Sequence, residues 1–295
     1  LKRNVQSGLL LLLLAVLLCC LTACGPTEGI FTGGNWQASG LPRQQIQVLV
    51  TDPDHLGNIY AGDQQAGVFA STDAGLSWKQ SNAGLPLPAD VHALAFDTSG
   101  KKLYAATSAG LFVSSDSAAS WNTVKGVPVN VYTALAFDLN SPQTLYVGAA
   151  HAGVLKSIDG GTTWTQIGRG LPTDSALISL LYDPTLKQLW AAFTDALYRF
   201  DNGGTVWQAM GNGLPAHTGL NALAQGTIVS GTEGPLFLAT DHGFFLSTDD
   251  GQHWLQSKSS LEALRIFAIL PDATQLAMVY ICLLYTSDAA DDLTR

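Results

Sequence analysis

Ser157-Ile158-Asp159-Gly160-Gly161-Thr162-Thr163-Trp164 decides the fold, because its pattern S-x-D-x-G-x-[ST]-W returns along the chain. We call this pattern the Ser-to-Trp motif. Residues 71–78 are a second full copy, residues 114–121 lack only the Gly, residues 247–254 carry His253 at the hydroxyl position, and residues 29–36 and 200–207 are decayed copies. The six tryptophans, at positions 36, 78, 121, 164, 207 and 254, stand 42 to 47 residues apart. A period of this length indicates one supersecondary unit per repeat.

The sequence between the motifs repeats as well. Gly-Leu-Pro follows four of them, starting at residues 40, 84, 170 and 213, and an apolar alternating run such as residues 91–96 comes next. Two further short runs, such as residues 103–106 and 110–113, lead to the next motif. Four short strands separated by turn residues predict one antiparallel blade, and repeated blades predict an all-β propeller. We expect five complete blades ending at Trp78, Trp121, Trp164, Trp207 and Trp254, plus partial ones, and six or seven blades in the full protein.

The motif itself has the chemistry of a hairpin turn. Its Asp can accept backbone hydrogen bonds, its Gly can adopt a positive φ, and its Trp can anchor the outgoing strand. It resembles the Asp-box, or bacterial neuraminidase repeat, a structural turn found in enzymes and non-enzymes alike, and the resemblance covers residues 29–270. The residues predicted to hold these turns are Asp73, Gly75, Trp78, Asp116, Trp121, Asp159, Gly161, Trp164, Gly204, Trp207, Asp249, Gly251 and Trp254.

The N-terminal residues have the pattern of an export signal. Lys2 and Arg3 precede an apolar run over residues 8–18, and Leu-Thr-Ala-Cys closes the segment at Cys24. These four residues resemble the bacterial lipobox, which implies cleavage before Cys24 and acylation of that Cys. We therefore expect a signal peptide over residues 1–23, a tether over residues 24–34, and an exported lipoprotein on the extracytoplasmic side of a bacterial membrane. An ordinary secretory signal that contains a Cys is the alternative.

The C-terminal residues break the repeat. Residues 282–292 resemble the translation of a sequencing-library adapter, and the unit that starts after Trp254 contains no further Ser-to-Trp motif. We therefore expect a truncated propeller over residues 35–281 and a non-native tail over residues 282–295.

Charge and composition narrow the function. The formal net charge is −9, from 14 Lys and Arg against 23 Asp and Glu, which argues against a nucleic-acid partner. Residues 25–281 contain no Cys, so a thiol-based redox or metal site is excluded there. We expect no cofactor, no bound metal and no catalytic residue.

Residues that differ between repeats gather in the loops opposite the motifs. Propeller topology places the loops between second and third strands at the same end of the ring as the connections between blades. Rigid scaffolds commonly bind their partners through such loops, although the same residues would also suit solvated turns. The candidate binding residues at this end are Arg43, Asp63, Gln64, His151, Arg169, Asp195, Asp241 and His242.

Three classes of function compete. The first is a non-enzymatic binding or assembly module for a protein or carbohydrate ligand, which resembles the photosystem II assembly and stability factor family. The second is a glycoside hydrolase of sialidase or xyloglucanase type, for which Asp63 with Asp195 or Asp241 is the carboxylate pairing to test. The third is a sortilin-like peptide receptor. We favour the first, because an arginine triad and a convincing catalytic pair are missing from the sequence.

Overall fold

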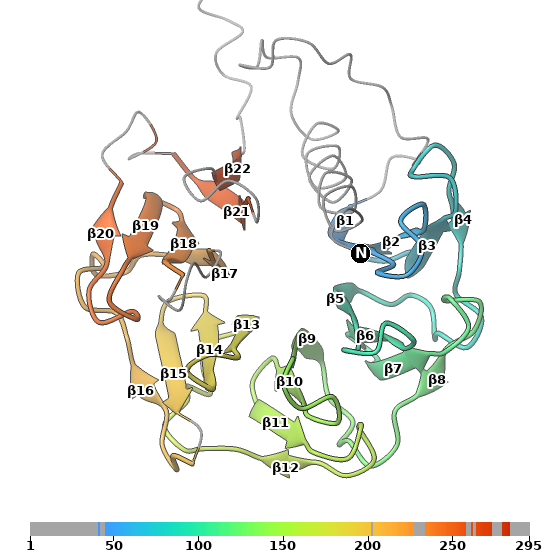
Figure 1. The fold of residues 1–295 in the computed structure, drawn as a ribbon, viewed down its shortest axis with the longest axis horizontal. Coiled ribbons are helices and arrows are strands. Elements are labelled where there is room, and N and C mark those ends of the chain that lie inside the picture. Colours follow the sequence, from blue (N-terminus) through green and yellow to red (C-terminus); the bar gives the residue numbers. More distant parts are fainter. Residues whose placement is uncertain are drawn as a thin grey trace, which may run out of the picture.

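The β-sheets are arranged in an open ring about a common axis, with the first strand of each nearest to it (Figure 1); we call the region around this axis the channel. This computed structural model describes residues 41, 45–201, 203–226, 234–257, 261, 264–272 and 279–283. The described residues form strands and turns, and no helix long and apolar enough to span a bilayer occurs among them. The predicted signal peptide, the tether and nearly all of the predicted tail lie outside the described residues.

Five sheets have four antiparallel strands each, in sequence order from the channel outward, and a sixth has two. Blade 1 comprises β1 (Ile46–Thr51), β2 (Ile59–Asp63), β3 (Val68–Ser71) and β4 (Lys79–Gln80). Blade 2 comprises β5 (Val91–Phe96), β6 (Leu103–Thr107), β7 (Gly110–Ser114) and β8 (Asn122–Thr123). Blade 3 comprises β9 (Tyr132–Phe137), β10 (Leu145–Ala149), β11 (Gly153–Ser157) and β12 (Thr165–Gln166).

Blade 4 comprises β13 (Leu177–Asp183), β14 (Gln188–Phe193), β15 (Leu197–Asp201) and β16 (Gln208–Ala209). Blade 5 comprises β17 (Leu220–Gln225), β18 (Leu236–Thr240), β19 (Gly243–Ser247) and β20 (Leu255–Gln256). The partial blade 6 comprises β21 (Ile266–Pro271) and β22 (Val279–Leu283). The predicted all-β propeller of four-stranded antiparallel blades is therefore confirmed. β22 extends two residues into the segment predicted to be foreign.

The hydrophobic core lies between neighbouring blades, because each sheet buries both of its faces. The second strands show this most clearly: all five residues of β2, β6, β10 and β18 are buried. Strands buried on both faces are expected to be predominantly apolar, and these read IYAGD, LYAAT, LYVGA and LFLAT, with a polar residue only at the end of three of them. Five separate clusters of buried side chains fill the five interfaces between consecutive blades.

Every inner strand carries the same irregularity near its start. The register against the second strand shifts by one residue in all six blades, for example between Val91 and Ala93 and between Leu220 and Ala222. A bulge of this kind leaves one residue unpaired and redirects its side chain. The unpaired positions are Gln47, His92, Thr133, Ile178, Asn221 and Phe267.

Polar bonds also join the inner strands of consecutive blades. The hydroxyl of Tyr182 on β13 donates to Asp138 Oδ2, at the end of β9, over 2.9 Å. One blade further, the Gln225 side-chain amide on β17 donates to Asp183 Oδ2 over 2.5 Å. In both pairs a side chain near the end of an inner strand donates to the Asp at the end of the inner strand of the preceding blade. The two bonds therefore join blade 3 to blade 4 and blade 4 to blade 5.

Candidate functional site

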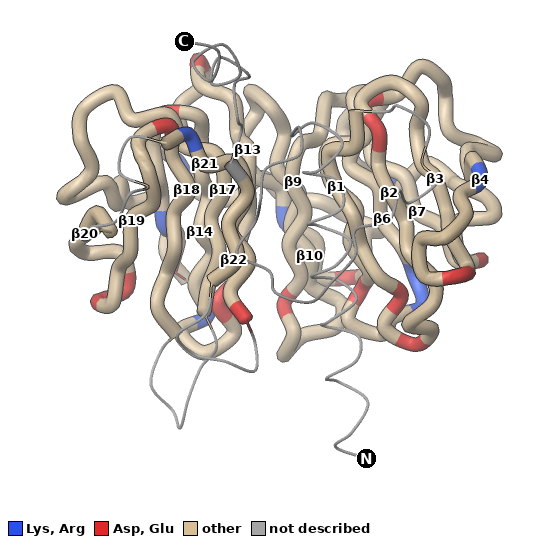
Figure 2. Tube along the Cα trace, turned by 90° about the horizontal axis from the view of Figure 1, so that it is seen from above, with Lys and Arg blue, Asp and Glu red and all other residues tan. Residues whose placement is uncertain are grey.

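The two ends of the ring carry different loops. The loops between second and third strands, together with the connections between blades, form one end, which we call the variable face. They are residues 64–67, 81–90, 108–109, 124–131, 150–152, 167–176, 194–196, 210–219, 241–242 and, between blades 5 and 6, the described residues 257, 261, 264 and 265. The other end, the motif face, carries the Ser-to-Trp motifs and the turns between first and second strands. Figure 2 shows these two ends above and below the strands, with acidic residues concentrated at one of them.

The motif of blade 3 is a closed network of hydrogen bonds. Asp159 Oδ1 accepts from the Ser157 hydroxyl over 2.7 Å and from the Thr163 backbone N–H over 2.9 Å. Its Oδ2 accepts from the Thr163 hydroxyl over 2.6 Å. The hydroxyl and backbone N–H of Thr163, with the hydroxyl of Ser157, hold the pKa of Asp159 at about 2, below its usual 3.8. The carboxylate therefore stays ionised, and its oxygens accept hydrogen bonds within the turn.

Three further motifs repeat this network. The hydroxyl-to-carboxylate bond is 2.6 Å between Ser77 and Asp73 and 2.5 Å between Ser120 and Asp116. In blade 5, His253 Nδ1 lies 2.7 Å from Asp249 Oδ2, so the imidazole takes the place of the hydroxyl. Hydrogen bonds, from Ser77 first, also hold the pKa of Asp73 at about 2. These carboxylates are poor candidates for acid or base catalysis, because their oxygens are already satisfied and the groups do not protonate near neutral pH.

The backbone of the motif needs two successive left-handed residues, at its fourth and fifth positions. Gly160 and Gly161 supply them in blade 3, with φ of 69° and 88°, and Gly75 and Gly251 occupy the fifth position in blades 1 and 5 with φ of 89° and 69°. Ala118 adopts φ of 65° where Gly is absent. In the decayed motif of blade 4 the positive φ falls on Gly203, at 90°, and Gly204 has none.

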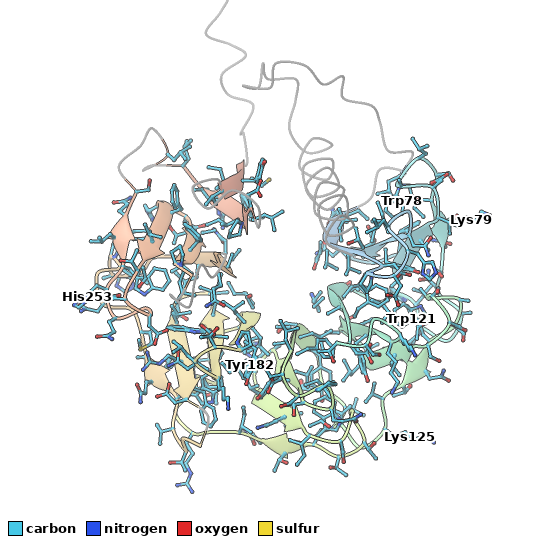
Figure 3. The ribbon with its side chains drawn as sticks, viewed as in Figure 1. Trp78, Lys79, Trp121, Lys125, Tyr182 and His253 are labelled. Atoms are coloured by element: carbon cyan, nitrogen blue, oxygen red, sulfur yellow. The ribbon has the colours of Figure 1, made fainter. Side chains whose placement is uncertain are left out.

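The motif tryptophans adopt two arrangements. The indoles of Trp121, Trp207 and Trp254 donate to a backbone carbonyl of the preceding blade, at Ser81, Ile167 and Met210, and all three rings are at least 97% buried. Trp78 and Trp164 instead donate to Gly75 and Gly161 of their own motif. Trp121, Trp207 and Trp254 each follow a Gly-Leu-Pro and Trp164 does not, but Trp78 also follows one, at residues 40–42, so this sequence alone does not decide the arrangement. Figure 3 shows Trp78 and Trp121 in consecutive blades.

On the variable face, one backbone hydrogen bond recurs in each complete blade. The first residue of the loop between second and third strands donates its N–H to the carbonyl that precedes the inner strand of the same blade, over 2.9 to 3.0 Å. The donor and acceptor pairs are Gln64 with Gln45, Ser108 with Asp90, Ala150 with Val131, Thr194 with Ala176, and Asp241 with Gly219. The first residue of the loop is therefore held by the same backbone bond in each complete blade, while its side chain and the length of the loop change from blade to blade.

Asp63 serves its own loop. Its Oδ1 accepts from the backbone N–H groups of Gln65 and Ala66 over 2.8 and 2.7 Å, and the residue is only 2% exposed. Thr107 and Thr240 occupy the same position in blades 2 and 5 and also bond within their loops. The second oxygen of Asp63, Oδ2, is buried and has no hydrogen-bond partner among the described residues. Because of its burial, Asp63 is unsuited to direct contact with a large ligand.

Asp195 and Asp241 lie in the loops of neighbouring blades 4 and 5. The buried hydroxyl of Ser175 donates to Asp195 Oδ1 and lies 2.9 Å from the Thr194 hydroxyl. Asp241 Oδ1 accepts from Asn221 Nδ2 over 2.9 Å and from Arg265 Nε over 2.6 Å. Burial raises the pKa of Asp241, but the bonds from Asn221 and Arg265 outweigh it and leave this pKa below its ordinary value.

Arg169 and the loop that carries His151 lie at the outer rim. A depression of about 520 Å³ is lined by Ala152 and Gly153, next to His151, and by residues 168–173. The backbone of Arg169 pairs with the motif of blade 4 through its carbonyl, which accepts from Trp207 N–H over 2.9 Å. Arg169 therefore lies away from the channel, because the connection between blades starts at the outermost strand. Arg43 lies outside the described residues.

The structure also places residues that the sequence did not single out. These are the six bulged residues of the inner strands, which lie at the variable-face end of the channel: Gln47, His92, Thr133, Ile178, Asn221 and Phe267. His92 Nδ1 lies 3.3 Å from Gln47 Oε1, and Thr133 donates to the Leu177 carbonyl over 2.7 Å. Burial lowers the pKa of His92, while the charge of Asp90 opposes this shift. The sequence does contain a signal for these residues: the second residue of each inner strand differs from blade to blade.

The carboxylates that could form a hydrolase pair are not brought together. Figure 1 places β2, which ends in Asp63, across the channel from β14 and β18, which lead to Asp195 and Asp241. Within the described part of the chain, no group of three or more His, Cys, Asp or Glu side chains is arranged to hold a metal ion.

Comparison with known proteins gives the family and the fold. The family model of the DUF6242 beta propeller domain matches residues 62–263. No curated protein matches the sequence.

Solved structures with a similar fold come from proteins of different kinds. The GH74 xyloglucanase from Xanthomonas campestris superimposes with a TM-score of 0.67 at 18% identity, over 81% of this chain and 44% of that one. The extracellular domain of the one-component system BT4673 from B. thetaiotaomicron gives 0.65 at 16% identity, over 83% and 32%. YCF48 from Cyanidioschyzon merolae gives 0.50 at 10% identity, over 83% and 95%. This chain spans less than half of the first two proteins, and such identities establish a shared fold alone.

Proposed function

This chain belongs to the DUF6242 beta propeller family, and we propose that it is a non-enzymatic binding or assembly module whose partner contacts the variable face. The partner is a protein or a carbohydrate. It meets the side chains of the loops between second and third strands and the bulged residues at the mouth of the channel.

One observation carries the proposal. The same backbone hydrogen bond fixes the first residue of each loop between second and third strands in the five complete blades, yet that residue is Gln, Ser, Ala, Thr or Asp. The bond uses backbone atoms alone, so it forms whichever side chain is present; Gln64, Ser108, Thr194 and Asp241 are at least partly exposed, whereas Ala150 is buried. Different side chains held at equivalent, backbone-bonded positions of a rigid scaffold are the arrangement expected of a recognition surface.

The motif face supports the proposal by contrast. Its carboxylates are engaged within their own turns, as in Asp159, and the same contacts return from blade to blade. Such repetition gives a partner little to distinguish one position from another.

The hydrolase alternative finds less support. Inverting glycosidases separate their two carboxyl groups by roughly 6.5–9.5 Å. Asp63 lies across the channel from Asp195 and Asp241, and it is nearly fully buried. Asp241 is already paired with Arg265. Similarity in fold to a xyloglucanase concerns the scaffold and leaves the site to be argued from its own residues. A sortilin-like peptide receptor, the third alternative, would bind its peptide through the same variable face.

We also propose that the module is held at a membrane on its extracytoplasmic side. The support is the lipobox-like segment that ends at Cys24, after an apolar run with basic residues before it. Two or more acyl chains on one residue give stable anchoring. An anchored module would search for its partner close to the membrane surface.

The test compares two sets of substitutions in the full-length protein. The variable-face set is Gln64→Ala, Asp195→Asn and His242→Ala, and the matched control set on the motif face is Lys101→Gln and Lys187→Gln. We expect partner retained from extracts of the source cells to fall about tenfold or more with the first set, the loss typical of a few energetically dominant contacts, and to stay unchanged with the control set. Loss of binding with the control set alone, or turnover of a glycan panel by the wild type, would refute the proposal.

A further inference from the structure

Arg265 is held in one orientation at the start of the inner strand of blade 6. Its Nε lies 2.6 Å from Asp241 Oδ1. Asp241 is itself fixed by Asn221 Nδ2 over 2.9 Å, and Asn221 also donates to the Ile266 carbonyl over 2.9 Å. The guanidinium is thus fixed through side chains of blade 5 and backbone of blade 6.

An aromatic ring supports the same guanidinium. The guanidinium carbon of Arg265 lies 5.0 Å from the centroid of the Phe267 ring. Phe267 is a bulged residue at the channel mouth, and 36% of its surface is exposed. Stacking on an aromatic face is a preferred environment for Arg and restricts the plane of its guanidinium.

The terminal nitrogens of this arginine remain available. The Arg265 side chain is 54% exposed, and neither Nη atom has a hydrogen-bond partner in the part of the chain that the structure describes. Arg199 differs from it: its Nη1 donates to Asp250 over 2.9 Å, its Nε lies 3.1 Å from Asp201, and only 14% of its side chain is exposed. Arg199 therefore joins blade 4 to blade 5, whereas Arg265 presents a fixed, unoccupied edge to solvent.

We propose that the outer edge of Arg265 binds a carboxylate group of the ligand, with Phe267 contacting an apolar part of the ligand beside that group. This inference rests on the proposed function, because it assigns the ligand chemistry at the blade 5 to blade 6 arc of the variable face. The planar fork of a guanidinium matches a carboxylate in a bidentate pair.

Nearby charges favour a carboxylate over a phosphate. Asp241 bonds directly to the guanidinium, and Asp195 is exposed in the neighbouring loop. Like charges repel an approaching anion in proportion to its charge, so a phosphate that carries close to two charges is penalised more than a carboxylate that carries one. The pairing of Asp241 with Arg265 and Asn221 reduces but does not remove this repulsion.

The experiment follows the side-chain Nε–H resonance of Arg265 in the ¹⁵N-labelled full chain, with four probes. These are N-acetylphenylalanine, its C-terminal amide, glucuronate and inorganic phosphate. We expect saturable shifts with N-acetylphenylalanine, no shift with its amide, and weaker shifts with phosphate. A response to glucuronate as strong as that to N-acetylphenylalanine would identify acidic sugars as ligands, and a weaker one would identify peptide carboxylates.

Two variants and a control complete the test. Because the resonance of Arg265 is lost on its replacement, binding to the variants is measured by calorimetry. Arg265→Gln should abolish binding of N-acetylphenylalanine, and Arg265→Lys should weaken it ~10-fold, because an ammonium cannot form the bidentate pair. Lys102→Gln, on the motif face, should bind as the wild type does. Equal binding of acid and amide, or full binding by Arg265→Gln, would overturn the inference. If that happens while the variable-face set still reduces partner capture, the proposed function stands and the carboxylate assignment alone fails.

Discussion

The bond between Tyr182 and Asp138 isolates what an inter-blade contact contributes to stability. Tyr182→Phe removes the hydroxyl that donates to Asp138 Oδ2 and retains the ring, which stacks on Tyr146 at a centroid distance of 5.5 Å. Figure 3 labels Tyr182 beside the channel. Burial, together with the bond to Asp138, raises the pKa of Tyr182, so the hydroxyl remains a donor at neutral pH.

The expected cost follows from the burial of the acceptor. Asp138 is 7% exposed, so its Oδ2 would lose a partner in a place that water reaches poorly. Leaving a buried acceptor unsatisfied costs about 1–3 kcal/mol, and we expect the lower part of this range, about 1–2 kcal/mol, because Tyr182 is partly exposed. For a chain of this size, that corresponds to a melting point lower by roughly 2–8 °C.

The assay is thermal unfolding followed by circular dichroism, with Tyr198→Phe as the matched control. Tyr198 lies in the same blade, and its hydroxyl has no hydrogen-bond partner among the described residues, so its loss should change the free energy of unfolding by less than about 0.5 kcal/mol. An unchanged melting point for Tyr182→Phe, or an equal decrease for both variants, would show that the bond does not stabilise the junction between blades 3 and 4.

Three further predictions concern the turns, the connections and the N-terminus. Gly84→Ala should destabilise the protein strongly in urea unfolding, because φ is 89° and the added Cβ would lie 2.1 Å from the Trp121 carbonyl oxygen. Gly211→Ala, with open space around it, should not. Asp159→Asn should lower the urea midpoint at neutral pH, and the difference from wild type should shrink from about pH 5 to about pH 2, because a depressed carboxyl pKa stabilises the folded state above the unfolded pKa. A constant difference would contradict this. Cys24→Ser should release the protein from membranes on fractionation; unchanged partitioning would argue against acylation.

The architecture could be predicted from the sequence because its repeat is local. The Asp of each of the four motifs that retain it bonds within eight residues, so Asp159 and its partners can be identified without knowledge of the ring. The spacing between successive motifs then gives the length of one blade. The same locality explains why Ala118 is tolerated: the turn requires a backbone conformation, and Ala can adopt it at a modest cost.

The candidate site was harder to predict, because it depends on contacts between blades. Arg265 carries no local signal of its role, since its partner Asp241 is 24 residues away and next to a different sheet. Asp63 resembles a surface carboxylate in the sequence, but the structure buries it as a loop cap. Arg169 precedes the inner strand β13 by only a few residues, yet it lies at the outer edge of the ring, because the connection that carries it begins at the outermost strand. None of these placements follows from local pattern.

Photo-crosslinking tests the choice of face most directly. A benzoylphenylalanine at position 64, 194 or 242 would probe the variable face, and one at position 101, 139 or 187 would probe the motif face. We predict adducts with the partner from the first set and none from the second. Adducts from the motif-face positions alone would contradict the proposed binding face.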